Sequence, residues 1–309
     1  MNFAFLFPGQ ASQYAGMGRL LAEQYPEARR LFEDADNALG FPLSTLCFNG
    51  PEEELKKTEN TQPALLAVSI AAHRVLHELG YKPALVAGHS LGEYSALVAA
   101  ESLGFVEALH LVRKRGQYMQ EAVPQGVGAM AAILKLPEGK LDAVLEEAAR
   151  GEVVAAANLN SPDQVVIAGH AEAVGRAAEL AKAAGAKRAI PLPVSAPFHC
   201  ALMRPAQEKL RADLHATTFK DLAIPLINNW QAREITKAED ARQGLYEQIP
   251  NPVRWTDTIR EMARKGIKVF VEVGPGSVLS GLTRSIDSGL QSVKFGEPAD
   301  LEKVKHALA

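Results

Sequence analysis

The sequence is poor in the residue types that mark several protein classes. It has only two cysteines, Cys47 and Cys200, far apart and without C-x-x-C spacing. Such a pair supports neither a disulfide framework nor a thiolate metal site, and it fits a reducing compartment. The formal net charge is −3, from 33 basic and 36 acidic residues. The chain therefore lacks the basic excess that general nucleic-acid binding requires.

Long hydrophobic runs are also missing. No apolar stretch reaches the length of a membrane span. The apolar segment MNFAFLFPGQ has no basic region before it, and Pro8 and Gly9 end the run. We therefore expect a buried first strand there rather than a signal peptide. No repeat or low-complexity tract occurs, and we expect a cytoplasmic protein that binds neither membranes nor nucleic acid.

What is present is the composition of a globular protein. The 309 residues are 47% hydrophobic, enough for one large core and a smaller second unit. Short apolar runs alternate with helical patterns, which predicts an α/β fold with a mostly parallel sheet. The predicted strands are Phe3–Phe7, Ala84–Ala87, Ile224–Asn228 and Val269–Val273. The predicted helices are Gln62–Leu79, Leu91–Glu101, Val106–Ala122 and Asn251–Lys265.

A different pattern fills the middle of the chain. From Gly128 the apolar periods read as strand, helix, two strands, helix and strand, bounded by the turn-forming segments PQG and AP. The order β-α-β-β-α-β is typical of a ferredoxin-like unit. We therefore predict a small ferredoxin-like domain at 125–196, inserted into a large α/β domain that comprises 1–124 and 197–309.

The segment GHSLG places Ser90 between an apolar strand and a helix. Gly88 and Gly92 relieve the crowding of a tight turn, and the free N–H groups at the helix start favour developing negative charge. Alternatively, Ser90 only caps the helix, and Glu93 completes a Ser-x-x-Glu capping box. The strand before and the helix after favour a nucleophile, as in α/β-hydrolases. We therefore expect the large domain to be α/β-hydrolase-like.

A serine nucleophile needs a base. His89 is adjacent in sequence, but on a sharp turn its side chain projects elsewhere. His73 and His77 have the i, i+4 spacing of metal ligands, yet the glutamate of H-E-x-x-H is missing, and an ordinary helix face is favoured over a metal site. His199 lies where the chain returns to the large domain, and loops at such junctions carry function. By itself, a histidine in the position of His199 is more often structural than catalytic.

Several motifs in a fixed order now become informative: FPGQASQYAGMG, NTQPALLA, GHSLGEYSAL, RKRGQYMQEA, NSPDQVVIAG, SAPFHC and NPVRWTDTI. With them the whole chain resembles the malonyl-CoA:acyl carrier protein transacylase family of fatty acid synthesis and the related acyltransferase domains of polyketide synthases. The resemblance implies ping-pong transfer of malonyl from malonyl-CoA to the phosphopantetheine thiol of acyl carrier protein, through a malonyl-serine and without a bound cofactor or metal. We expect a monomer. The alternatives are a trans-acting polyketide acyltransferase, a serine thioesterase or hydrolase, and a non-catalytic module that binds carrier proteins.

The resemblance also implies the catalytic roles. Ser90 would take the acyl group, and His199 would be its general base. The backbone N–H groups of Gln10 and Leu91 would form the oxyanion hole, and the backbone carbonyl of Gln248 would orient the histidine.

A carboxylate partner for the histidine is not evident from the sequence. Between Ser90 and His199 the main aspartates are Asp142, on a predicted helix of the insert, and Asp163, in its NSPDQ loop. Neither follows a strand of the large sheet, as the triad acid of an α/β-hydrolase would. The sequence therefore favours a Ser–His pair with a neutral third member, consistent with the Gln248 carbonyl.

The remaining candidates would bind substrate. Arg115 falls on the apolar stripe of the helix Val106–Ala122, where a buried guanidinium needs a partner; the resemblance makes that partner the malonyl carboxylate, and a core ion pair is the alternative. Phe198, beside the base, would exclude branched acyl groups or would only pack in the core. Gln62 and Asn160 would line the pocket. Ala11 stands where the family usually has glycine, and we expect its methyl group to fit if φ is negative.

Overall fold

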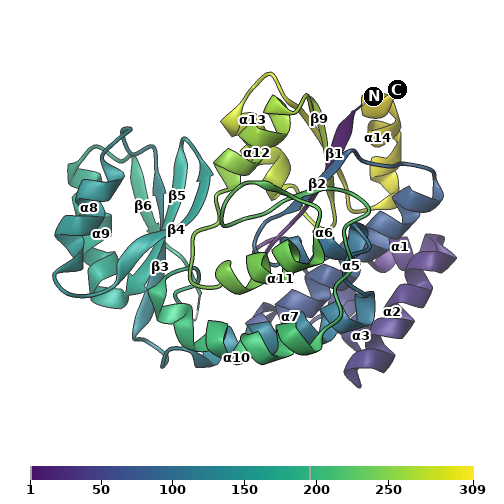
Figure 1. Ribbon diagram of the computed structural model, residues 1–309, viewed down its shortest axis with the longest axis horizontal. Coiled ribbons are helices and arrows are strands. Elements are labelled where there is room, and N and C mark those ends of the chain that lie inside the picture. Colours follow the sequence, from purple (N-terminus) through teal and green to yellow (C-terminus); the bar gives the residue numbers. More distant parts are fainter. Residues whose placement is uncertain (1, 195) are drawn as a thin grey trace.

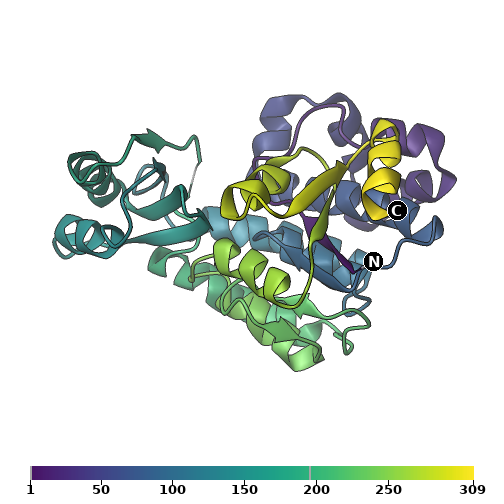
Figure 2. The ribbon, with the colours of Figure 1, turned by 90° about the horizontal axis from the view of Figure 1, so that it is seen from above.

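The structure is a computed structural model that describes residues 2–194 and 196–309, so Met1 and Ser195, the serine of the SAPFHC motif, lie outside the described residues. Two sheets organise it, with strand orders β10-β9-β1-β2-β7-β8 and β4-β5-β3-β6. Figures 1 and 2 show the smaller sheet and its two helices set to one side of the part built on the larger sheet. Both views place the ends of the chain together on the large part, far from the small sheet.

The large sheet is parallel except for its last strand. Its strands are β10 (Gln291–Phe295), β9 (Val269–Val273), β1 (Phe3–Phe7), β2 (Leu85–Gly88), β7 (Leu226–Ile227) and β8 (Glu234–Ile235). Strands β1 and β9 have the predicted bounds and are buried throughout, as parallel strands covered on both faces are. Strand β2 begins one residue later than predicted, and β7 keeps only two residues of the predicted strand.

Alternate side chains of the large sheet enter two different cores. Phe5 and Val271 belong to a core that includes the long helices α5 (Thr58–Glu78) and α7 (Phe105–Glu121). Leu6 and Phe270 belong to a second core with α12 (Trp255–Arg264) and α13 (Val278–Ile286). The period of two along each strand thus places helices on both faces of the sheet. Because β1, β2 and β7 run parallel, their carboxyl ends lie at the same edge of the large sheet.

The other helices surround this sheet. They are α1 (Arg19–Gln24), α2 (Pro26–Leu39), α3 (Leu43–Asn49), α4 (Glu52–Lys56), α6 (Gly92–Ala99), α10 (Arg204–Ala216), α11 (Ala238–Glu247), α14 (Leu301–Leu308) and the 3-10 turns η1 (Ala201–Met203) and η2 (Pro298–Asp300). Of these the sequence predicts only α6. No helix among the described residues has both the length and the apolar character needed to cross a bilayer.

Helix α12 begins four residues later than predicted, and the reason is a contact with the small sheet. The Val253 N–H group donates to the Ala157 carbonyl at 2.9 Å, and the Val253 carbonyl accepts from the Leu159 N–H group at 2.9 Å. The chain around Val253 is therefore extended beside β4 (Val154–Ser161). The start of the predicted helix is used instead to join the two sheets.

The small part has the predicted order β-α-β-β-α-β. Its elements are β3 (Gly128–Leu134), α8 (Leu141–Ala149), β4, β5 (Gln164–His170), α9 (Ala171–Ala183) and β6 (Arg188–Pro191). All strand pairs are antiparallel. Alanine- and valine-rich sides of α8 and α9 pack with Ile133 and Ile167 in a separate small core.

Candidate active site

Ser90 stands on a turn so tight that its flanking glycines are required. The His89 N–H group donates to the Phe7 carbonyl of β1 at 3.0 Å. A Cβ atom on Gly92 would lie 2.0 Å from that carbonyl oxygen, and one on Gly88 would lie 1.9 Å from the backbone of Gly92. Ser90 itself has φ of 51°, a left-handed conformation that costs energy for a non-glycine residue. This is the local geometry expected of a nucleophile elbow.

The Ser90 hydroxyl lies against His199. Ser90 Oγ is 2.7 Å from His199 Nε2, and His199 Nδ1 is 2.9 Å from the Gln248 carbonyl oxygen. A carbonyl only accepts, so Nδ1 carries the proton and Nε2 accepts from the hydroxyl. The Ser90 side chain makes no cap bond to α6, so the capping alternative is wrong.

The environment of His199 keeps its ring neutral. Burial, assisted by the positive charge of Arg115, lowers the pKa of His199 to about 3. The ring is therefore uncharged at neutral pH and free to accept a proton. Among the described residues no carboxylate hydrogen-bonds to His199. The two aspartates considered in the sequence belong to the small part: Asp142 lies on α8, and Asp163 lies in the turn between β4 and β5.

Arg115 reaches the same hydroxyl from α7. Its side chain is only 2% exposed. One terminal nitrogen donates to Gln62 Oε1 at 2.8 Å, and the other donates to Ser90 Oγ at 3.0 Å and to Gln248 Oε1 at 2.8 Å. All these acceptors are neutral, so within the described chain the guanidinium has no direct carboxylate partner. The core ion pair that the sequence left open is therefore not found there.

The loop after β1 approaches the elbow from the other side. A Cβ atom on Gly9 would lie 2.5 Å from the His89 carbonyl oxygen, so the two backbones are in close contact. Within the described residues, the N–H groups of Gln10 and Leu91 donate to no protein acceptor. Ala11 has φ of 83°, so the condition under which its methyl group was expected to fit, a negative φ, is not met. A methyl group in this conformation is strained.

The other candidate substrate-binding residues are Asn160, Gln62 and Phe198, and they differ in how directly they contact the catalytic residues. Asn160, on β4, has its Oδ1 atom 2.8 Å from His89 Nε2, so it reaches the elbow through the neighbour of the nucleophile. Gln62, on α5, contacts Arg115 directly. Phe198 precedes the base and is buried within the larger core.

Two residues of the site were missed in the sequence. Asn229 Oδ1 accepts from the Ser90 N–H group at 2.7 Å, and Asn229 Nδ2 donates to the Gly88 carbonyl at 2.7 Å. Glu93 Oε2 accepts from the Asn229 N–H group at 3.1 Å and from Gln248 Nε2 at 2.8 Å. Asn229 follows β7, which neighbours β2, and sites of open α/β sheets form at the carboxyl ends of such strands. The position of Asn229 at the carboxyl end of β7 was therefore the sequence signal that could have identified it as a site residue.

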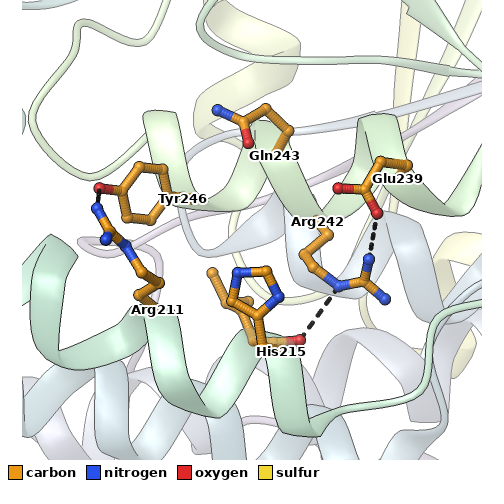
Figure 3. A pocket seen from close by; sticks show the side chains of 7 residues that line it. Arg211, His215, Glu239, Arg242, Gln243 and Tyr246 are labelled. Carbon is orange, nitrogen blue, oxygen red and sulfur yellow. Dashed lines mark hydrogen bonds and ion pairs between the residues drawn. The ribbon is translucent and has the colours of Figure 1, made fainter.

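The described residues contain no second candidate centre for chemistry, neither a metal site nor a reactive cavity. They contain no cluster of three or more His, Cys, Asp and Glu that could hold a metal ion. His73 instead packs edge-on against the rings of Phe5 and Phe7. A cavity between α10 and α11 is lined by polar side chains, among which Arg211 hydrogen-bonds to Tyr246 and Arg242 forms an ion pair with Glu239 (Figure 3). None of the candidate site residues lines this cavity.

Known proteins resemble this chain over nearly its full length. The family model described as "Acyl transferase domain" matches residues 4–303. The chain is 51% identical over 299 residues to the malonyl CoA-acyl carrier protein transacylase of Escherichia coli (strain K12), covering 96% of this chain and 97% of that protein. It is 50% identical over 302 residues to the protein of the same name from Bacillus subtilis (strain 168), covering 97% and 95%.

Solved structures agree. An acyl carrier protein S-malonyltransferase from Vibrio cholerae matches with a TM-score of 0.96 at 48% identity, covering 98% of this chain and 100% of that one. A malonyl-transacylase solved in complex with a type II PKS acyl-carrier protein also matches with a TM-score of 0.96 at 48% identity, covering 98% of each chain.

Fold and site together define an α/β protein with a Ser–His pair on a nucleophile elbow. The chain belongs to the acyl transferase family, among the malonyl CoA-acyl carrier protein transacylases. The resemblance carried by the ordered motifs is therefore confirmed at the level of the family.

Proposed function

We propose that this chain transfers the malonyl group from malonyl-CoA to the phosphopantetheine thiol of acyl carrier protein, in fatty acid synthesis. One observation carries the proposal. The Ser90 hydroxyl lies between a neutral acceptor, His199 Nε2 at 2.7 Å, and a buried cation, Arg115 at 3.0 Å. Any serine acyltransferase or hydrolase needs the first neighbour, but only an acyl group that bears its own carboxylate needs the second.

The first half-reaction acylates Ser90. His199 Nε2 takes the hydroxyl proton as Oγ attacks the thioester carbonyl, and the Gln248 carbonyl stabilises the imidazolium through Nδ1–H. The N–H groups of Gln10 and Leu91 receive the oxyanion, each worth about 3 kcal/mol in comparable sites. Collapse of the tetrahedral intermediate expels the coenzyme A thiolate, which takes the proton from His199.

The second half-reaction reverses the first with a different thiol. His199 takes the proton of the phosphopantetheine thiol, the thiolate attacks the malonyl-serine carbonyl, and Ser90 leaves with the proton returned from His199. Bonds and charges balance without a metal or redox partner, which supports a reaction whose only carriers are the two thioesters. We therefore propose that no cofactor is bound.

Substrate selection is assigned to two side chains. Arg115 would exchange its contacts to Ser90 Oγ and Gln248 Oε1 for the malonyl carboxylate, a bidentate pairing stronger than bonds to neutral acceptors. Gln62 would keep the guanidinium in place meanwhile. Phe198, directly before the base, would leave little room for an α-methyl group, a discrimination worth about 1–3 kcal/mol.

The route to the site is proposed along β4. A cavity there is lined by Lys135, Lys187 and Arg188 together with Gln164 and one carboxylate, Asp163. Gln164 bonds to Asn160, which bonds to His89 of the elbow, so one wall of this cavity is linked to the turn that carries Ser90. Its cations suit the phosphates of coenzyme A and of the carrier's phosphopantetheine arm. The two buried free thiols further support a reducing, cytoplasmic setting, and a monomer suffices because this chain supplies every group used above.

The strand orders support a finer description of the fold. The parallel sheet with Ser90 after β2 supports an α/β-hydrolase-like domain formed by 1–124 and 197–309. The antiparallel order β4-β5-β3-β6 supports a ferredoxin-like insert at 125–196.

The test uses the acceptor. With catalytic amounts of this chain and excess malonyl-CoA, holo acyl carrier protein should gain one malonyl group by intact mass faster than free malonate appears. A serine hydrolase would give malonate instead, and a non-catalytic carrier-binding module would give neither product.

A further inference from the structure

Glu93 is a buried carboxylate that the reaction above does not use. It lies on α6, three residues after Ser90, and is fully buried. Its Oε2 atom accepts two hydrogen bonds, from the Asn229 N–H group and from Gln248 Nε2. Its Oε1 atom has no partner among the described residues. A carboxyl group buried with half of its acceptors unused is costly, so its presence beside the nucleophile asks for an explanation.

One of its two donors holds the base. The Gln248 backbone carbonyl accepts from His199 Nδ1, while its side-chain Oε1 accepts from Arg115 and its Nε2 donates to the Ser90 carbonyl at 3.0 Å. A guanidinium only donates, so Oε1 must face Arg115, and Nε2 must then face the acceptors Glu93 and Ser90. Glu93 thereby helps to fix both ends of Gln248.

The other donor holds the nucleophile. Asn229 accepts from the Ser90 N–H group and donates to the Gly88 carbonyl, so its side chain spans the elbow. Its own N–H group is bound by Glu93 at 3.1 Å. A single oxygen atom on α6 thus connects the end of β7, through Asn229, and the end of α11, through Gln248, to the turn that carries Ser90.

We propose that Glu93 is a positioning residue for acyl transfer: its Oε2 atom holds Gln248 and Asn229 so that His199 and Ser90 stay aligned. The acceptor, and not the charge, performs this role. Burial raises the pKa of Glu93 to about 7, opposed by its bonds to Gln248 and Asn229 and by the positive charge of Arg115. Oε2 accepts both bonds in either protonation state. The proposal deepens the proposed function, because alignment of these two residues is what that reaction uses.

Two variants separate the acceptor from the charge. Glu93→Gln keeps an oxygen that can accept both bonds, so kcat should stay within about fivefold of wild type. Glu93→Leu has similar size and no acceptor, so kcat should fall about a hundredfold, as loss of supporting contacts or a small misplacement does. The KM for malonyl-CoA should change far less, because Arg115 keeps its own position through Gln62.

Glu272 provides the matched control. It is also fully buried, on β9, and its two oxygens accept from the N–H groups of Leu279 and Ser280 at 3.0 and 2.8 Å, at the start of α13. Glu272→Leu therefore removes a buried carboxylate and two bonds of the same kind from outside the site. It should lower the melting temperature without lowering kcat at temperatures where circular dichroism reports a folded chain.

A readout independent of malonyl-CoA distinguishes this inference from the proposed function. A fluorophosphonate reacts with a serine that its histidine activates, and its rate of addition to Ser90, followed by intact mass, reports that alignment. Relative to wild type, Glu93→Leu should react about a hundredfold more slowly, and Glu93→Gln and Glu272→Leu nearly as fast. The inference is overturned if folded Glu93→Leu reacts at the wild-type rate, or if folded Glu93→Gln is as slow as Glu93→Leu. If this pattern holds but wild type never transfers malonyl, only the proposed function fails.

Discussion

The part built on the large sheet buries ionisable side chains, whereas the part built on the small sheet buries only neutral polar ones among the described residues. The buried His, Asp, Glu and Arg side chains of the described residues all belong to the part built on the large sheet: His73, Glu93, Arg115, His199, Glu272 and Asp300. In the small part, between residues 128 and 191, the buried polar side chains within that description are Asn158, Asn160 and Ser161, all on β4. Burying a charged group is costly, and in the large part three of these side chains, Glu93, Arg115 and His199, lie beside the nucleophile.

The strand arrangement explains the difference. The carboxyl ends of β1, β2 and β7 meet at one edge of the parallel sheet, where the helix start after β2 and the loops supply donors and acceptors. The small sheet is antiparallel and has its own apolar core on one face, and Asn160 of its strand β4 hydrogen-bonds to the elbow at His89. We therefore expect substitutions at this edge of the large sheet to change the chemistry and those in the small part to change the approach of substrates.

The largest contrast is between His199 and Asp163. His199→Ala removes the base and should lower kcat/KM by about 100- to 10,000-fold, the usual contribution of general base catalysis. Asp163→Asn alters a surface turn of the small part and should stay within about twofold. Steady-state kinetics with malonyl-CoA and holo acyl carrier protein measures both. A collapse in the Asp163 variant would place a catalytic carboxylate in the small part and end the comparison.

Arg115→Ala is the next largest. Loss of a buried charge-assisted pair costs about 2–5 kcal/mol, so kcat/KM for malonyl-CoA should fall tens- to thousands-fold. Acetyl-CoA, which has no carboxylate to lose, should be affected far less. Equal slowing of both substrates would show that Arg115 serves the elbow and not the acyl group.

A pH effect on stability should trace to the large part. Burial, with His77 and Arg74 as lesser causes, lowers the pKa of His73 to about 4, whereas the unfolded value is about 6.5. Between these values the unfolded chain binds a proton that the folded chain does not, so the free energy of unfolding falls as pH drops. At pH 5 the loss is about 2 kcal/mol.

Replacing the histidine tests this linkage. In His73→Leu, the decline in unfolding free energy between pH 7.5 and pH 5 should be smaller than in wild type by about 2 kcal/mol. Urea unfolding at the two pH values measures it. Parallel declines in the two proteins would remove His73 from the account.

The smallest predicted effect compares two strained loops. Ala11, in the large part, and Arg150, in the small part, both have positive φ, 83° and 45°. Replacing either residue with glycine relieves the left-handed conformation and should raise the free energy of unfolding by about 1 kcal/mol or less. Only Ala11→Gly loosens the loop of Gln10, so only it should also change kcat. Denaturant unfolding and steady-state rates give both results. An equal change of kcat in Arg150→Gly would contradict the claim that only the large part changes the chemistry.

The sequence predicted the parts of this molecule that have strong local signals. Strands β1 and β9 are continuous apolar runs, and the small part has regular periods. Shorter helices such as α1 and α4 were missed because six or five residues carry too little periodicity. The longer helices α2 and α10, of 14 and 13 residues, were also missed, although their length is sufficient for a helical period. Likewise, the start of α12 could not be placed, because its first residues pair with β4.

The site shows the same limit. The resemblance brought Ser90, His199, Arg115 and Gln248 onto one list, and the structure places them within hydrogen-bond reach of one another. Glu93 stood in the sequence as part of a possible cap, since its partners Gln248 and Asn229 are more than a hundred residues away. The positive φ of Ala11 was not predicted, although the family usually has glycine, the residue that adopts this conformation most readily, at the same position.

The central claim is that Ser90 carries the malonyl group. Intact mass after mixing with malonyl-CoA, before carrier protein is added, tests it most directly. Wild type should gain one malonyl unit, lose it when holo acyl carrier protein is added, and show no gain when Ser90 is replaced by alanine. An adduct that persists in Ser90→Ala would contradict the claim, because the acyl group would then sit on another residue.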